Sequence, residues 1–135
     1  MAPRGLSIGM FGVFGRSAEL RALDKALRSV DLHPNVVPEA VKLAAVGLLR
    51  EHAPDGELAP SSYRAAAEIV AYCMIGRDAF AHANDETLAA QVERRIEAAL
   101  EPGTSLDAKL VLLTLHARVI QASVVEDFGL ESSGN

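Results

Sequence analysis

Hydrophobic side chains recur along this chain with the spacing of one face of an α-helix. Over residues 17–30, leucine and valine return every three or four positions, while Arg21, Lys25 and Arg28 form a neighbouring stripe. A helix advances about 100° per residue, so this pattern places the apolar side chains on one face and the cations on another. The segment is therefore predicted to be an amphipathic helix at the surface.

The same periodicity predicts five helices and a short sixth. Their predicted ranges are 17–30, 38–52, 61–83, 86–100, 105–121 and 123–130. No stretch alternates between apolar and polar residues as a half-buried strand would. The predicted fold class is all-α, a compact bundle of five to six helices. The nearly all-apolar helix 105–121 and the middle of helix 61–83 are expected at its centre.

Polar residues at the predicted helix starts indicate how the helices begin. Ser61 or Ser62 can cap the third helix, and Asn84 and Asp85 form a turn that can cap the fourth. Thr104, with Asp107 three residues later, approximates a capping box for the fifth helix. These candidate caps indicate where the third, fourth and fifth helices begin.

The length of the chain favours one domain. It has 135 residues, and domains usually run to about 100–150 residues. The predicted organisation is a flexible Gly-rich segment over 1–16, a single helical domain over 17–130 and a disordered tail over 131–135.

Charge and cysteine content narrow the classes of function. The net charge of −5 argues against a broad phosphate-binding face, so no nucleic-acid partner is predicted. No apolar run reaches the roughly 18–20 residues that a membrane-spanning helix needs, so no membrane partner is predicted either. The single cysteine allows no internal disulfide, which favours a reducing compartment and a cytoplasmic location.

The candidate chemistry is concentrated in AYCMIGRDAFAHAN, residues 71–84. In one continuous helix His82 lies about half a revolution from Cys73, so these two side chains cannot meet. We interpret Cys73 as a small core residue, with a reactive role beside a distant His116 as the alternative. Gly76 indicates either a close helix crossing or a ligand that approaches the backbone.

Metal and cofactor chemistry are not predicted. The four histidines show neither HxxxH nor HExxH spacing, so ligands would have to converge from separate helices. No catalytic residue, metal site or cofactor is therefore assigned from the sequence.

The alternative function is binding of a small molecule between the third and fifth predicted helices. Tyr72, Cys73, Met74 and His116 would line this pocket, with Arg77 at its mouth. Apolar walls with a few polar groups are typical of ligand pockets.

The pattern FGRS…ALDKALRSVDLHPNVVPEAVK…YCMIGRDAF…SLDAKLVLLTLHA…VVEDFGLE covers most of the chain. It resembles that of small all-helical bacterial proteins of alphaproteobacterial type, to which no activity is assigned. The resemblance implies a helical fold and no particular chemistry.

The predicted function is a non-enzymatic cytoplasmic interaction or regulatory module that acts through helix surfaces on a protein partner or a second copy. Its basis is surplus apolar surface, since Val70, Met74 and Ile75 lie off the predicted inner face of their helix. Such a surplus must find a partner helix within the domain or in another chain. A small-molecule-binding protein is the first alternative, and an enzyme using Cys73 or His116 is the second.

Overall fold

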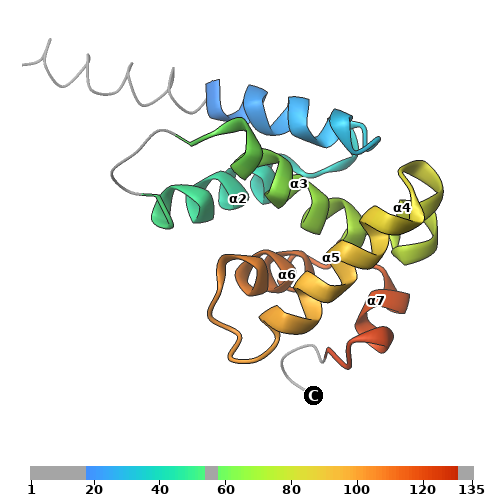
Figure 1. The fold of residues 1–135 in the computed structure, drawn as a ribbon. Helices are drawn as coiled ribbons and strands as arrows, with labels where there is room; N and C mark the ends of the chain where they lie inside the picture. The colour runs from blue at the N-terminus through green and yellow to red at the C-terminus, as the bar shows by residue number, and fades with distance from the viewer. Residues whose placement is uncertain (1–17, 54–57, 131–135) are drawn as a thin grey trace, which may run out of the picture.

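The computed structural model describes residues 18–53 and 58–130, and within these ranges all regular structure is helical. An α-helix covers 18–29, and the short 3-10 helix η1 covers Pro34–Val36 (Figure 1). The α-helices that follow are α2 (Glu39–Glu51), α3 (Pro60–Ile75), α4 (Arg77–Ala83), α5 (Glu86–Ala99), α6 (Leu106–His116) and α7 (Ala122–Asp127). The predicted all-α bundle is confirmed, with seven α-helices in the described ranges in place of five or six.

The predicted end segments cannot be compared with this fold. Residues 1–16 and 131–135 lie outside the described ranges. Within those ranges, no helix combines the length and the apolar character that crossing a membrane requires.

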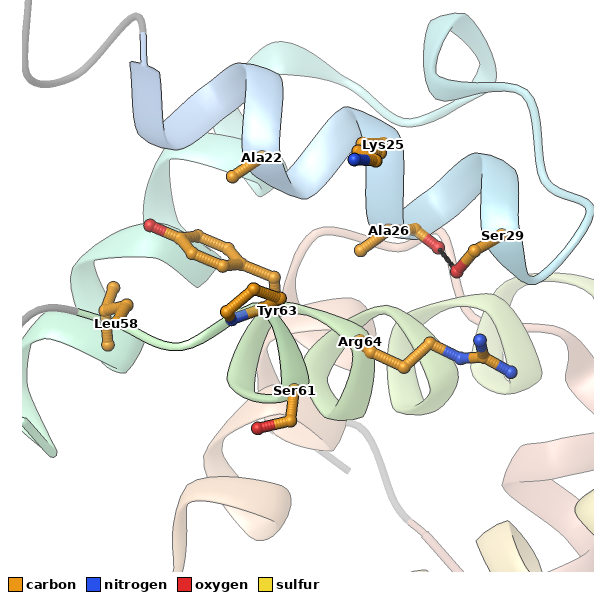
Figure 2. Close-up of a pocket in the computed structure, with 9 residues that line it drawn as sticks. Ala22, Lys25, Ala26, Ser29, Leu58, Ser61, Tyr63 and Arg64 are labelled. Carbon is orange, nitrogen blue, oxygen red and sulfur yellow. Dashed lines mark hydrogen bonds between the residues drawn. The ribbon is translucent and has the colours of Figure 1, made fainter.

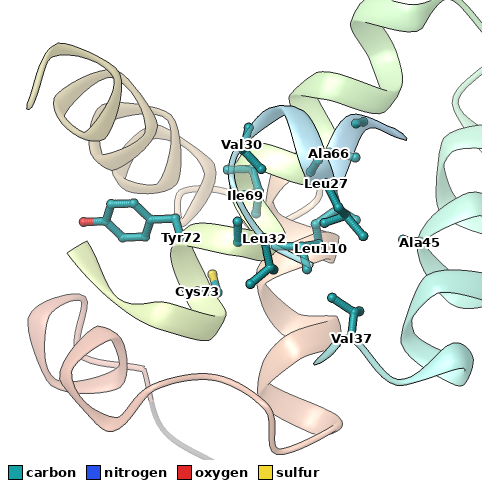
Figure 3. Close-up of a cluster of buried hydrophobic side chains, with 14 of the residues drawn as sticks. Leu27, Val30, Leu32, Val37, Ala45, Ala66, Ile69, Tyr72, Cys73 and Leu110 are labelled. Atoms are coloured by element: carbon teal, nitrogen blue, oxygen red, sulfur yellow. The ribbon is translucent and has the colours of Figure 1, made fainter. Parts of the chain in front are cut away.

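The centre of the bundle is formed by α3 and α6. Helix α3 packs against α2, α4, α5 and α6, while α6 packs against α2, α3 and α5. Ile69 and Cys73 of α3 and Leu110 of α6 are completely buried in one hydrophobic cluster (Figure 3). Helix 18–29 adds Leu27 and Val30 to the same cluster. The core is therefore filled mainly by aliphatic side chains from all the long helices.

Helix 61–83 was predicted as continuous, and this prediction is wrong. The chain breaks at Gly76, where φ is 92° and ψ is 164°, and resumes as α4. This backbone region is accessible almost only to glycine. A Cβ atom at Gly76 would lie 3.3 Å from the Ser123 hydroxyl oxygen, so α7 approaches the break closely. The glycine thus permits both the turn and the contact with α7.

Helix α6 is shorter than the predicted 105–121 because it ends in a Schellman motif. The N–H of Val119 donates to the Thr114 carbonyl over 3.0 Å, and the N–H of Arg118 donates to the Leu115 carbonyl over 3.1 Å. Arg118 takes the left-handed position, with φ of 62°, that glycine usually occupies in this motif. The ending carries no glycine that would mark it in the sequence.

The observed N-cap residues agree with the predicted ones at some helices only. Asp85 caps α5 as predicted, because its carboxylate accepts from the Leu88 N–H over 2.6 Å. Helix α6 is capped by Ser105, which accepts from the Ala108 N–H over 3.2 Å, so the prediction of Thr104 is wrong by one residue.

The predicted serine cap of the third helix is also wrong. Helix α3 starts at Pro60, with Ala59 at the N-cap position and no side-chain capping bond. Proline suits this first turn because its missing N–H would have no partner there. Ser61 and Ser62 lie inside the helix.

Candidate binding groove

An open groove runs between helix 18–29 and the first turns of α3, with a volume of about 490 Å³ (Figure 2). Its lining residues are Ala22, Lys25, Ala26, Ser29, Leu58, Pro60, Ser61, Tyr63 and Arg64. We call this set the groove. Its walls are mainly apolar, with two cationic side chains.

The groove exists because helix 18–29 presents small side chains to α3. Ala22, Ala26 and Ser29 recur at i, i+4 and i+7, so they share one face of the helix. Their neighbours Leu23 and Leu27 point into the core, where each is 1% exposed. The leucines thus pack into the hydrophobic core, while the row of small residues leaves the space beside them unfilled.

Tyr63 forms the aromatic part of the groove. Figure 2 shows its ring between the two helices, near Ala22 and Leu58. The residue is 6% exposed, and burial raises the pKa of its hydroxyl, while the charge of Arg50 acts in the opposite direction. The hydroxyl therefore stays protonated and can donate a hydrogen bond.

The two cationic side chains lie on opposite sides of the groove. Lys25 is exposed on helix 18–29 and makes no ion pair with any residue of the described ranges. The Arg64 Nε donates to a Glu68 carboxylate oxygen over 3.0 Å, and the Arg64 side chain remains 44% exposed. Lys25 and Arg64 can therefore bind negatively charged groups at the edges of the groove, while its interior can pack against apolar side chains.

Sequence reasoning did not identify the groove. The leucine stripe of residues 17–30 predicts the inner face of the first helix, and the alanines that line the groove lie beside that stripe. The signal that points to the groove is the row Ala22, Ala26 and Ser29, whose members are too small to fill the space between two helices. The opposite wall depends on where Tyr63 is placed, which no local pattern specifies.

The residues predicted for the alternative pocket have different surroundings. Cys73 is completely buried, and burial raises the pKa of its thiol to about 12, against the smaller effect of a side-chain hydrogen bond with Thr114. His116 is the last residue of α6 and is exposed. The Thr114 hydroxyl itself donates to the Val111 carbonyl over 2.7 Å within α6.

The Tyr72 ring packs against aromatic rings of α4 and of the segment after α7. Its ring centroid lies 5.7 Å from that of Phe80 in α4 and 6.3 Å from that of Phe128, which follows α7. Burial, followed by the charge of Glu93, raises the pKa of the hydroxyl. Among the described residues this hydroxyl has no hydrogen-bond partner, although it is buried.

Arg77, predicted at the mouth of that pocket, joins α4 to α5. Its guanidinium donates to Glu86 over 2.9 and 3.3 Å and to Glu93 over 3.4 Å. The bonds to Glu86 and Glu93 raise the pKa of Arg77, and the bond from Arg77 lowers the pKa of Glu86. Met74 is half-buried against the core. A common pocket for the five residues stays a prediction.

Cys73 and His82 do not lie in one continuous helix, contrary to the prediction. Cys73 lies in α3 and His82 lies in α4, on either side of Gly76. Burial is what distinguishes them, because Cys73 is inaccessible and His82 is exposed. Within residues 18–53 and 58–130, no three histidine, cysteine or carboxylate side chains are grouped as a metal site would need.

Comparison with known proteins adds no functional information. No protein family, no curated protein and no solved structure matches this chain.

Proposed function

We propose that the protein is a non-enzymatic interaction module whose groove receives apolar side chains of a partner protein. The observation that carries the proposal is the open space of about 490 Å³ between helix 18–29 and α3. Binding of the apolar face of an amphipathic helix in a hydrophobic groove is a recurring mode of protein recognition. Burial of that face in the groove would supply most of the binding free energy.

The surplus apolar surface expected on α3 does not support binding there. Val70 is 2% exposed, and Met74 and Ile75 pack against the core. These side chains find their partners within the chain, so self-association through them loses its basis. The proposal therefore rests on the groove.

The chemistry of the lining supports binding of a partner. The residues that line the groove include no histidine, cysteine or carboxylate among those described. The Ser29 hydroxyl donates to the Ala26 carbonyl over 2.6 Å, so its proton is engaged within its own helix. Tyr63, Lys25 and Arg64 supply donors that can fix the orientation of a bound segment.

The test uses a designed amphipathic peptide, with leucine at i, i+3, i+4 and i+7 and glutamine elsewhere, added to the isotopically labelled protein. We expect its addition to shift the backbone NMR signals of Ala22, Ala26, Tyr63 and Arg64. The variant Ala22→Trp should abolish these shifts, because the indole fills the space. Ala98→Trp, at an exposed site on α5, is the matched control and should leave them unchanged.

Shifts that map to other surfaces, or that persist in Ala22→Trp, would contradict the proposal. Thermal unfolding of both tryptophan variants shows whether each is folded. Only variants with a cooperative transition are compared.

A further inference from the structure

The exposed side of helix 18–29 carries a row of cations beside the groove. Arg21, Lys25 and Arg28 stand at i, i+4 and i+7, and all three are exposed. With 3.6 residues per turn, the row lies about 60–120° round the helix from Ala22. It runs for about 10 Å along the axis, at 1.5 Å per residue. Lys25 lines the groove, and Arg21 and Arg28 continue its charge along the same side of the helix.

This row is an unneutralised charge in an acidic protein. The chain has a net charge of −5, yet none of the three cations pairs with a carboxylate in the described part of the chain. The two acids of this helix are engaged elsewhere. Asp24 accepts from the Lys42 Nζ over 3.0 Å, and Glu19 pairs with Arg50.

Arg64 adds positive charge on the opposite side of the groove, on α3. Its partner Glu68 also accepts from Arg95 over 2.8 Å, so this one carboxylate serves two guanidinium groups. A ligand lying in the groove would thus have cations along one side and a half-exposed arginine on the other.

We infer that the partner segment is an acidic amphipathic helix, an inference that rests on the proposed function of the groove. Its apolar residues would enter the groove, and Asp or Glu residues at i, i+4 and i+7 would face Arg21, Lys25 and Arg28. A helix repeats its side chains at the same spacing as this row. Such complementary charges fix the register and raise the association rate.

The length of the row argues for a peptide in preference to a small anion. A single carboxylate can meet one or two adjacent cations, whereas the row extends over about two helical turns. The net charge of −5 disfavours a nucleic acid, whose phosphates need a broad basic surface.

The experiment compares two fluorescein-labelled peptides with the same leucine pattern, one with glutamate and the other with glutamine at its polar positions. At low salt, fluorescence anisotropy should show the glutamate peptide binding about tenfold more tightly, as expected for complementary charges across an interface. This advantage should shrink at physiological salt, because exposed charges are screened.

Charge-reversal variants test whether the preference for the glutamate peptide depends on the row of cations. The double variant Lys25→Glu/Arg28→Glu should weaken the glutamate peptide about tenfold or more and change the glutamine peptide by less than about twofold. Arg94→Glu, at an exposed site on α5, is the control and should leave both affinities within about twofold. A control that loses as much affinity as the double variant would overturn the inference, because attraction would then be general.

The two proposals fail in different ways. If both peptides bind equally and shift the groove signals, the acidic partner is overturned and the groove remains the binding site. If neither peptide shifts the signals of Ala22 and Tyr63, both proposals fall.

Discussion

The backbone N–H of Gln121 donates a hydrogen bond to the carbonyl oxygen of Cys73 over 2.8 Å. In an uninterrupted helix that carbonyl would accept from residue 77, four positions later. The break at Gly76 removes this partner, and the N-cap residue of α7 replaces it. One interaction therefore satisfies the end of α3 and attaches α7 to the bundle.

This arrangement predicts that Gly76→Ala destabilises the protein by about 2 kcal/mol, since a non-glycine residue in this backbone region costs about 1–3 kcal/mol. The new Cβ would also meet the Ser123 hydroxyl at 3.3 Å. Urea unfolding at equilibrium measures the difference. The added variant Ser123→Ala should recover the steric part of the loss only, because φ at residue 76 would remain unfavourable.

Gly47→Ala is the matched control for Gly76. Gly47 lies inside α2, and a Cβ built there has no atom within 4 Å. Alanine should raise the stability by about 0.5–1 kcal/mol through its better helix propensity. A Gly76→Ala variant as stable as Gly47→Ala would show that the break does not require glycine.

The helices themselves could be predicted from the sequence, because their positions depend on local periodicity. Asp85 before α5 is also a local signal, since a cap needs only its own N–H partner three residues later. Where a helix end depends on a distant contact, the sequence misled. Gly76 predicts a close helix crossing, and α7 does approach it, but nothing near Gly76 in the sequence indicates that α3 ends there.

The end of α6 and the role of Asp107 show the same limit of local sequence patterns. Arg118 occupies a left-handed position that sequence rules reserve for glycine. Asp107 was read as part of a capping box, but its carboxylate accepts from Arg95 of α5 over 2.9 and 3.1 Å. A tertiary partner, Arg95, decides the role of Asp107, whereas the end of α6 is closed by local hydrogen bonds that no glycine marks in the sequence.

Substitution of the half-buried Arg95 is predicted to destabilise the protein more than substitution of an exposed arginine. Besides Asp107 it donates to Glu68 over 2.8 Å and to the Ala65 carbonyl over 3.0 Å, so it connects α3, α5 and α6. Arg95→Leu should cost about 2 kcal/mol, because hydrogen bonds to charged groups contribute about 1.5–3 kcal/mol each and are partly offset by desolvation. Arg95→Lys should rescue little, since an ammonium cannot reproduce the forked geometry.

The neighbouring Arg94 supplies the control for this series. It is exposed on α5, and Arg94→Leu should change the stability by less than about 0.5 kcal/mol. Equal losses at residues 94 and 95, measured by urea unfolding, would contradict the role given to the Arg95 network.

Tyr72→Phe is predicted to leave the stability unchanged or to raise it by about 1 kcal/mol, because a buried donor without a partner costs about 1–3 kcal/mol. The ring contacts with Phe80 and Phe128 would be retained. Tyr72→Ala, which removes the ring, should cost about 3–5 kcal/mol. A clear loss in Tyr72→Phe would mean that the hydroxyl has a partner in solution, such as water or a ligand.

Cys73 should resist thiol reagents in the native protein. It is 0% exposed, and its thiol stays protonated near neutral pH, so attack requires unfolding. Labelling with a chromogenic disulfide should therefore follow the fraction unfolded as urea is increased. Rapid labelling without urea would revive the alternative of a reactive cysteine.

Cys73 also predicts how stability responds to alkali. Burial raises the pKa of the thiol from 9.0 to about 12, whereas in the unfolded chain it returns towards its ordinary value. Above pH 9 the unfolded state therefore binds fewer protons than the folded state. The contribution of the protonated thiol to the free energy of unfolding is thus complete below pH 9 and is lost as the pH rises towards 12. The loss approaches about 1.4 kcal/mol per pH unit for one proton. Cys73→Ala lacks this group, so its stability should fall less steeply above pH 9. Parallel curves for the two proteins, measured by urea unfolding across this range, would show that the thiol ionises as readily in the folded as in the unfolded chain.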